Sequence, residues 1–185
     1  MRAKTVLSIA YCFDFDECLV TTTARINIFR NGTYYKSMNS KEYSLYQRRP
    51  GDKLDFSEFD DGEYILDAKP YKVWHIIKHI SDAIKSGRKF ATIYVLTARS
   101  LPVRPYIYEF LKSHGIDIEI EHILTIGDSI GKINIAKEKR KVLATLNNKY
   151  DNVVFYDDDL KNIKIAQSIT PEIKTRLIEK KLIFK

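Results

Sequence analysis

Short apolar runs that end in polar residues dominate the pattern of this sequence. Three of them, Val6–Phe13, Phe90–Leu96 and Asn152–Tyr156, are rich in Val, Ile, Tyr and Phe, which is typical of buried strands. Between them, apolar residues recur at the three- and four-residue spacing of amphipathic helices. Helix Pro70–Ser86, for example, has a proline near its start and Gly87 just past its end. This alternation predicts an α/β fold with a parallel sheet covered by helices on both faces.

The pattern predicts one domain over residues 1–185, a three-layer Rossmann-like arrangement large enough to bury roughly 70% of the surface of its unfolded chain. A last segment, Ile173–Phe184, is expected to form a strand at the sheet edge, with a helix as the alternative. The expected strands are Thr5–Phe13, Phe90–Leu96, Ile116–Ile126 and Asn152–Tyr156, and the expected helices are Pro70–Ser86, Pro102–Ser113, Ile133–Lys149 and Leu160–Ser168.

The segment Thr21–Lys69 departs from this alternation and is predicted to be a small insert. Ile26–Phe29 and Thr33–Lys36 flank Arg30-Asn31-Gly32, and Asn-Gly between alternating runs is a strong hairpin signal. A short helix capped by Asn39 or Ser40 is expected next. Because the insert directly follows the first strand's polar end, we expect it to cover that end as a cap.

Composition narrows the setting of the protein. The chain has 185 residues, a formal net charge of +7 and two cysteines, Cys12 and Cys18. Two cysteines indicate no disulfide framework and favour a reduced, cytoplasmic setting. No segment approaches the ~20 apolar residues of a membrane span. The basic charge admits nucleic acid as a partner, although a solvated lysine-rich surface is the favoured interpretation.

Acidic and hydroxyl side chains follow the three apolar runs. Asp14, Asp16 and Glu17 follow the first, Thr97 follows the second, and Asp157–Asp159 follow the third. Carboxyl ends of parallel strands meet at one edge of a sheet, so these groups are expected to converge. Crowded carboxylates are costly unless a cation or hydrogen bonds offset their charge. The sequence therefore predicts a site for a divalent cation and phosphate.

These residues resemble the motifs of the haloacid dehalogenase-like (HAD) hydrolase superfamily, in the same order and over essentially the whole chain. Asp14-Phe15-Asp16 matches the first motif, although Cys18 departs from the usual Thr or Val. Thr97 in Leu96-Thr97-Ala98-Arg99 matches the second motif, and Asp157-Asp158 matches the fourth. The chain is also similar to uncharacterised HAD-like proteins of bacteriophages.

The third motif of that family is a lysine on the helix before the last catalytic strand. Lys139 lies three and four residues before Val142 and Leu143, so it shares their inward face, whereas Lys137 and Lys141 do not. Lys132, near the helix start, is an alternative. Asp128, in Gly127-Asp128-Ser129, is a competing match to the fourth motif, but choosing it leaves the triplet Asp157–Asp159 without a role.

The resemblance implies a catalytic mechanism and a role for each matched residue. Asp14 would attack phosphorus to form an aspartyl-phosphate, and Asp16 would act as general acid and base. Thr97 and Lys139 would complete the catalytic set by contacting the phosphoryl group, with Thr97, Ala98 and Arg99 binding substrate. Arg99 could equally pair with a carboxylate. Mg²⁺ would be held by Asp14, the Asp16 backbone carbonyl, and one or both of Asp157 and Asp158.

The predicted function is therefore that of a Mg²⁺-dependent phosphomonoester hydrolase acting on a phosphorylated small molecule or nucleotide. Basic charge and the aromatic residues of the insert favour a nucleotide or polynucleotide-end phosphatase as the alternative. A non-catalytic binding or assembly protein on the same scaffold is a third interpretation. The presence of both Asp14 and Asp16 argues against it, because a scaffold needs neither carboxylate.

Overall fold

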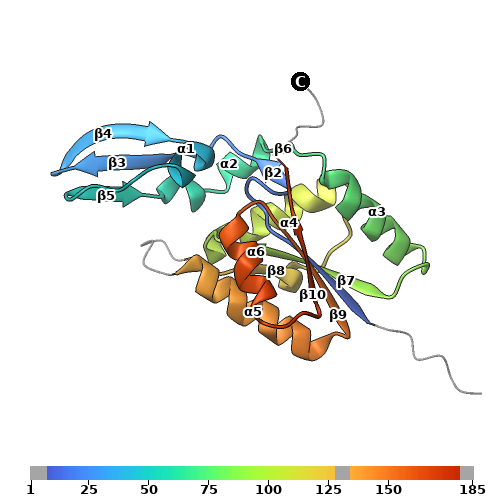
Figure 1. Cartoon of the computed structure of the whole chain (residues 1–185). Coiled ribbons are helices and arrows are strands. Elements are labelled where there is room, and N and C mark those ends of the chain that lie inside the picture. The colour runs from blue at the N-terminus through green and yellow to red at the C-terminus, as the bar shows by residue number, and fades with distance from the viewer. Residues whose placement is uncertain (1–7, 128–133, 180–185) are drawn as a thin grey trace, which may run out of the picture.

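The computed structural model describes residues 8–127 and 134–179 of the chain. Within them, five strands form one parallel sheet (Figure 1), in the spatial order β10-β9-β1-β7-β8. The strands are β1 (Ile9–Phe13), β7 (Ala91–Thr97), β8 (Ile123–Thr125), β9 (Asn152–Asp157) and β10 (Ile173–Leu177). The edge strand predicted over Ile173–Phe184 is confirmed as β10, which begins at Ile173 but ends at Leu177.

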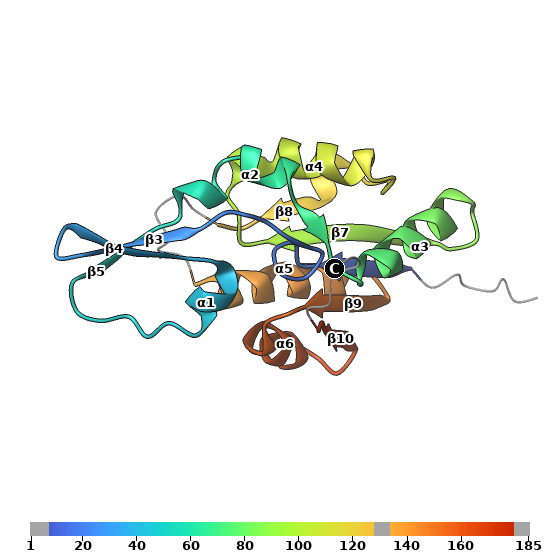
Figure 2. The ribbon, with the colours of Figure 1, turned by 90° about the horizontal axis from the view of Figure 1, so that it is seen from above.

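Four helices cover the described part of this sheet, two on each face. Helices α3 (Trp74–Lys85) and α4 (Arg104–Ser113) pack on one face, and α5 (Ile135–Lys149) and α6 (Leu160–Gln167) on the other. Figure 2 shows α4 on one side of the sheet and α5 and α6 on the opposite side. The predicted three-layer α/β fold is confirmed.

The alternation of side chains along β1 supplies both cores. Phe13 belongs to the cluster beneath α3 and α4, whereas Ala10 and Cys12 belong to the cluster beneath α5 and α6. Neighbouring strands divide in the same way, with Val95 on the first face and Leu96 on the second. Because both faces are buried at the centre of the sheet, β1, β7 and β9 are largely apolar, and the apolar runs seen in the sequence follow from this.

The strand order places the polar clusters together. After β1 the chain forms β7 and β8 on one side of it, and then crosses through α5 to form β9 and β10 on the other side. The order thus reverses at β1, and ligand sites of open α/β sheets lie beyond the carboxyl ends at such a point. Asp14 follows β1 at this edge, with Thr97 and Asp157 ending the two adjacent strands.

Two predicted boundaries were wrong. The helix expected from Pro70 begins at Trp74, because Pro70 belongs to β6 (Lys69–Pro70), which pairs with β2 (Val20–Thr21). The strand expected over Ile116–Ile126 shortens to β8, because the Asp117 backbone N–H donates to Ser81 Oγ rather than to a strand. Outside the insert, the described residues also form the 3-10 helices η2 (Leu101–Val103) and η3 (Ile120–His122).

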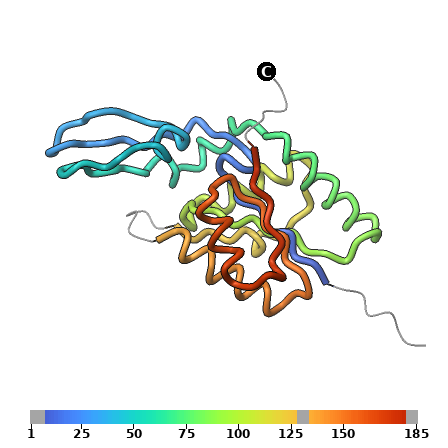
Figure 3. The backbone as a smooth tube through the Cα atoms, viewed as in Figure 1, coloured from blue at the N-terminus to red at the C-terminus, as the bar shows by residue number. Residues whose placement is uncertain are grey.

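The insert carries its own antiparallel sheet, which projects from the core in Figure 3. The hairpin is confirmed, because β3 and β4 pair around Asn31 and Gly32, whose φ angles of 52° and 85° suit a type I′ turn. Asn39 caps α1 as predicted, through a reciprocal pair of hydrogen bonds with Glu42. Its elements are β3 (Ile26–Arg30), β4 (Thr33–Met38), α1 (Ser40–Ser44), β5 (Asp52–Asp55), η1 (Ser57–Phe59) and α2 (Glu63–Leu66).

Strand β5 was missed because its charged residues disfavour a strand assignment. The structure compensates the charge of Asp52, which is buried. Its carboxylate accepts hydrogen bonds from Arg30 Nε at 2.8 Å, the Tyr46 hydroxyl at 2.6 Å and the Arg49 backbone N–H at 2.7 Å. These donors, led by Arg30, hold the pKa of Asp52 well below its usual range.

None of the helices in the described ranges has the length and the apolar composition of a membrane span.

Candidate active site

Asp14 leaves the end of β1 inside a tight turn. Its backbone N–H donates to the Tyr156 carbonyl at 2.9 Å, which extends the pairing with β9 by one residue. The chain then turns through Glu17, whose φ of 60° lies in the left-handed region that most side chains avoid. Glu17 is held by its backbone bond to Val20 and by the hydroxyl of Tyr71. The turn thereby fixes the acidic pair Asp14 and Asp16 at the edge of the sheet.

Lys139 extends from α5 to the end of β1. Its Nζ donates to Asp14 Oδ1 and to Asp157 Oδ2, both at 2.7 Å, and the residue is only 2% exposed. Lys137 and Lys141 are exposed, and Lys141 pairs with Glu138 instead. The helical phase of Leu143 thus identified the lysine that points inward. Asp14 Oδ2 has no hydrogen-bond partner among the described residues.

Burial and charge act against each other at this centre. Burial raises the pKa of the Asp14 carboxyl well above its ordinary value, and the ammonium of Lys139 opposes that effect. Burial alone would lower the pKa of Lys139, but the charges of Asp14 and Asp157 outweigh it and raise that pKa. Lys139 therefore stays protonated and compensates part of the buried negative charge.

The acidic residues after β9 have different surroundings. Asp157 is fully buried, and both of its oxygens accept hydrogen bonds, from Lys139, the Asn162 amide and the Asp159 backbone N–H. Asp158 is partly exposed and lines a groove that also contains Asp14 and Lys139. One carboxylate oxygen each of Asp14, Asp157 and Asp158 lie within 4.8 Å of one another. Three carboxylates face one ammonium, and this oxygen set with its surplus negative charge fits Mg²⁺.

Thr97 ends β7, the strand next to β1. It is fully buried, and its Oγ1 accepts a hydrogen bond from the Arg99 backbone N–H at 3.2 Å, so its hydroxyl hydrogen can turn toward another acceptor. The loop after Thr97 packs against Gly127, where a Cβ atom would overlap the carbonyl of Ala98. Gly127 is thus needed for this close approach, although the sequence suggested only its neighbour Asp128 as a candidate.

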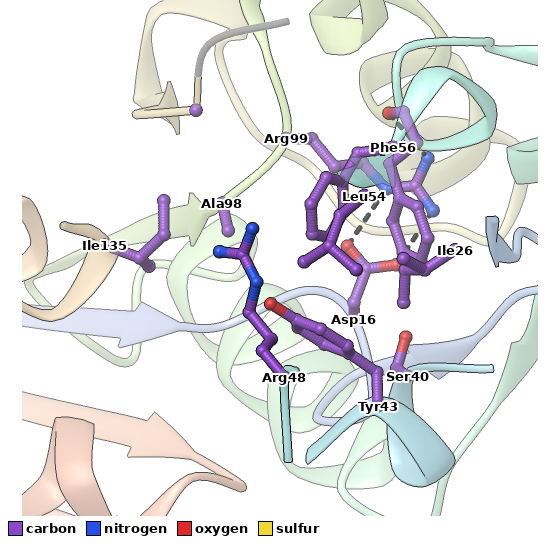
Figure 4. Close-up of a pocket in the computed structure, with 12 residues that line it drawn as sticks. Asp16, Ile26, Ser40, Tyr43, Arg48, Leu54, Phe56, Ala98, Arg99 and Ile135 are labelled. Carbon is purple, nitrogen blue, oxygen red and sulfur yellow. Dashed lines mark hydrogen bonds and ion pairs between the residues drawn. The ribbon is translucent and has the colours of Figure 1, made fainter. Parts of the chain in front are cut away.

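Arg99 turns toward a carboxylate rather than toward open space. Its Nε and Nη2 donate to Oδ2 and Oδ1 of Asp16 at 2.9 and 2.8 Å (Figure 4), and the residue is 2% exposed. Nη1 donates to the Phe59 carbonyl at 3.1 Å, and Nη2 also donates to Thr22 Oγ1 at 3.1 Å. Of the two roles that the sequence left open, carboxylate pairing is the one observed. The contacts to Thr22 and Phe59 tie Asp16 to the insert.

Two cavities meet in front of this centre, between the insert and the core. The first, of about 320 Å³, is lined mainly by apolar side chains of the insert and includes Asp16 and Arg99. The second, of about 660 Å³, is a groove that contains Asp14, Lys139 and Asp158 and continues along the start of α6. The residues common to both are Asp16, Ser40, Tyr43, Arg48, Ala98 and Ile135.

The structure thus brings together Asp14, Lys139, Asp157 and Asp158, and it places Thr97 at the end of the neighbouring strand. Asp16, Ala98 and Arg99 line the adjoining cavities. The alternatives Asp128 and Lys132 lie outside the described residues. Sequence reasoning missed Asn162, whose amide orients Asp157, and Arg48, which lines both cavities. The position of Asn162, one turn into the helix after Asp157, was a usable signal. Arg48 carried no such signal, because its location depends on the fold of the insert.

Comparison with known proteins gives a likeness of fold. No protein-family model and no curated protein matches the sequence. Two structures of the Pnkp1/Rnl/Hen1 RNA repair complex contain a chain similar to this one, with TM-scores of 0.56 and 0.55 at 12% and 11% identity. The match covers 97% and 98% of this chain but 48% and 45% of those chains, so this chain spans about half their length.

A further similar structure is the HAD domain of the effector protein Lem4 from Legionella pneumophila, with a TM-score of 0.49 at 15% identity. This match covers 97% of this chain and 89% of that domain. The identities are low, and the likeness therefore concerns the arrangement of helices and strands. The predicted similarity to bacteriophage proteins stays a prediction.

Proposed function

We propose that this chain is a phosphomonoester hydrolase of the HAD type that depends on Mg²⁺ and uses Asp14 as its nucleophile. The observation that carries the proposal is the position of Lys139, buried between Asp14 and Asp157 at the carboxyl ends of β1 and β9. A lysine held there neutralises a nucleophilic carboxylate and the phosphate that approaches it. Phosphoryl transfer depends mainly on such positioning and neutralisation.

The reaction proceeds in two steps. In the first, an oxygen of Asp14 bonds to phosphorus, the bond from phosphorus to the leaving oxygen breaks, and Asp16 gives that oxygen a proton. In the second, Asp16 takes a proton from water, which bonds to phosphorus as the Asp14 bond breaks. Inorganic phosphate and a free Asp14 carboxylate result. Thr97 and Lys139 donate hydrogen bonds to phosphoryl oxygens throughout.

The carboxylates of Asp14 and Asp158, with the neighbouring Asp157, would hold the metal ion. Bound Mg²⁺ supplies positive charge that offsets the repulsion between Asp14 and the phosphate. Asp157 itself is occupied by hydrogen bonds from Lys139 and Asn162, so we assign it mainly to orientation of the lysine. Asp158, on the groove side, is the better placed ligand.

A non-catalytic scaffold is the competing interpretation. Burying a charged group is costly, and a buried ion pair is often no more stable than apolar residues of similar volume. A chain selected only for assembly gains nothing from Asp14, Lys139 and Asp157 at the base of an open groove. The fold likeness to a chain of an RNA repair complex supports the choice of phosphorylated oligonucleotides as test substrates beside small phosphoesters.

Phosphate release from p-nitrophenyl phosphate tests the proposal. We expect turnover with MgCl₂, none with EDTA, and loss of turnover in Asp14→Asn. The matched control is Asp117→Asn, which removes one exposed carboxylate at the opposite end of the sheet. Equal turnover of Asp14→Asn and Asp117→Asn would overturn the proposal, and so would turnover that is unaffected by EDTA.

A further inference from the structure

The first cavity has the size and the aromatic lining expected of a site that binds a planar ring. Its walls include the half-buried aromatic rings of Tyr43, Phe56 and Phe59 and the side chains of Ile26 and Leu54. Tyr43 and Phe56 meet edge to face with centroids 5.5 Å apart, and Phe56 and Phe59 are 6.4 Å apart. Apolar cavities of this size with a few polar groups are typical of small-molecule sites.

Arg48 provides a cation at the point where this cavity joins the catalytic groove. Figure 4 shows its guanidinium extending from the insert toward Ala98, beside the ring of Tyr43. Arg48 is exposed, and its one hydrogen bond among the described residues is a long contact to the Asp52 carbonyl at 3.5 Å. No described carboxylate lies within ion-pair distance of it. A guanidinium in this state is suited to a phosphate or carboxylate of a ligand.

Charge is unevenly distributed along the insert. Residues 25–54 contain seven Lys or Arg and two Asp or Glu, whereas residues 55–67 contain six acidic residues and no basic one. None of those six carboxylates lines the described part of either cavity. Several of them are engaged within the chain itself, since Glu58 accepts from Arg25, Asp60 from Ser100 and Asp61 from Glu63. Of the charged residues in 25–67, only Arg48 lines the described part of either cavity.

The groove also extends beyond what a small phosphoester would fill. It runs from Asp14 past Tyr46 of the insert to Lys161 and Asn162 at the start of α6. Tyr34 and Tyr35, on the hairpin and outside the lining of both cavities, are 56% and 47% exposed. Arg30, which is paired with Asp52, stacks over Tyr35 at 3.8 Å. Exposed aromatic rings among cations are what single-stranded nucleic acids bind, because bases stack on rings and phosphates pair with cations.

We propose that the substrate is the phosphorylated end of a single-stranded nucleic acid. Its terminal phosphate lies at Asp14, the terminal base enters the cavity beside Tyr43 and Phe56, and the next phosphodiester contacts Arg48. This inference rests on the proposed phosphatase function and adds the class of substrate. Arg48 is the residue that distinguishes an oligonucleotide from a mononucleotide, because only the former has a phosphate beyond the terminal one.

The test compares kcat/KM on four kinds of substrate: p-nitrophenyl phosphate, mononucleotides, hexanucleotides phosphorylated at either the 3′ or the 5′ end, and a phosphotyrosyl peptide. We expect one hexanucleotide to exceed its mononucleotide by about tenfold or more, as one charge-assisted contact allows. This advantage should fall as salt rises, since each neutralised phosphate releases counterions. Arg48→Gln should remove the advantage, and Tyr43→Leu should lower kcat/KM on hexanucleotide about tenfold through lost stacking.

Arg49→Gln is the matched control. It removes the same charge from the next residue along the chain, and the Arg49 side chain lines neither cavity. It should retain the wild-type preference. Thermal unfolding of each variant separates lost binding from lost folding. Equal effects of Arg48→Gln and Arg49→Gln, no preference for any hexanucleotide, or a preference for the phosphotyrosyl peptide would overturn the inference. Absence of turnover on every substrate, including p-nitrophenyl phosphate, would instead refute the proposed phosphatase function.

Discussion

Arg99 holds Asp16 through two hydrogen bonds of 2.9 and 2.8 Å, one to each carboxylate oxygen. The same guanidinium donates to the Phe59 carbonyl, which belongs to the insert. Arg99 occupies one lone pair of each oxygen and leaves the other available for proton exchange, so the guanidinium orients Asp16 for the acid-base role that we propose. Since Arg99 also holds the insert, its side chain links the position of the insert to the position of Asp16.

This link predicts a dependence on the leaving group. Arg99→Lys keeps the charge but cannot bond both oxygens in the same geometry, so Asp16 should be misplaced. We expect kcat to fall about tenfold more on an alkyl phosphate than on p-nitrophenyl phosphate, whose leaving group needs no protonation. The control Ser100→Ala removes a hydrogen bond to Asp60 of the insert without touching Asp16. An equal loss on both substrates would mean that Arg99 does not act through Asp16.

Lys139 should affect both turnover and stability. Lys139→Met leaves Asp14 and Asp157 buried without their shared cation, and removal of one partner of a buried ion pair costs about 3–5 kcal/mol. We expect a large fall in kcat together with a lower melting temperature. Lys137→Ala and Lys141→Ala, on the exposed face of α5, are the controls and should change neither quantity appreciably. A Lys139→Met protein that turned over like these controls would shift the assignment to Lys132.

The two carboxylates after β9 should be separable by metal titration. Asp158→Asn should raise the Mg²⁺ concentration for half-maximal activity by about 10- to 100-fold, as expected for a weakened metal site, with little change in stability. Asp157→Asn should also lower the melting temperature, because Lys139, Asn162 and Asp159 donate to its oxygens. If Asp128→Asn proves the more sensitive change in calorimetric Mg²⁺ binding, the assignment of the fourth motif is wrong.

Asp52 makes the stability of the insert sensitive to acid. Because hydrogen bonds led by that from Arg30 lower its pKa in the folded state, Asp52 stabilises the fold above the unfolded-state pKa of about 3.9. This contribution is lost as pH falls through the folded-state pKa. The difference in unfolding free energy between wild type and Asp52→Asn should be largest near pH 6 and shrink below about pH 4. Urea unfolding at several pH values measures it, and a difference that does not change with pH contradicts the assignment.

The sequence predicted those parts of the site that depend on strand order and helical phase. Asp14, Thr97 and Asp157 were found because parallel strands bring their ends together, and Lys139 because it shares a helix face with Leu143. The rest depends on long-range contacts that no local pattern encodes. Arg99 could pair with a carboxylate or a substrate, and only the fold brings Asp16 within its reach. The charged strand β5 could not be predicted either, because its burial depends on the hydrogen bonds that Arg30 and Tyr46 donate to Asp52.

The covalent role of Asp14 is the central claim, and an acid-quench experiment tests it most directly. The protein is mixed with Mg²⁺ and excess p-nitrophenyl phosphate, quenched in acid within the first turnovers, and digested for mass spectrometry. We predict that the peptide containing Asp14 carries one added phosphoryl group, and that this group is absent in Asp14→Asn and in a sample quenched without substrate. Turnover with no phosphorylated peptide at any quench time, or with the phosphoryl group on another residue, would contradict the account.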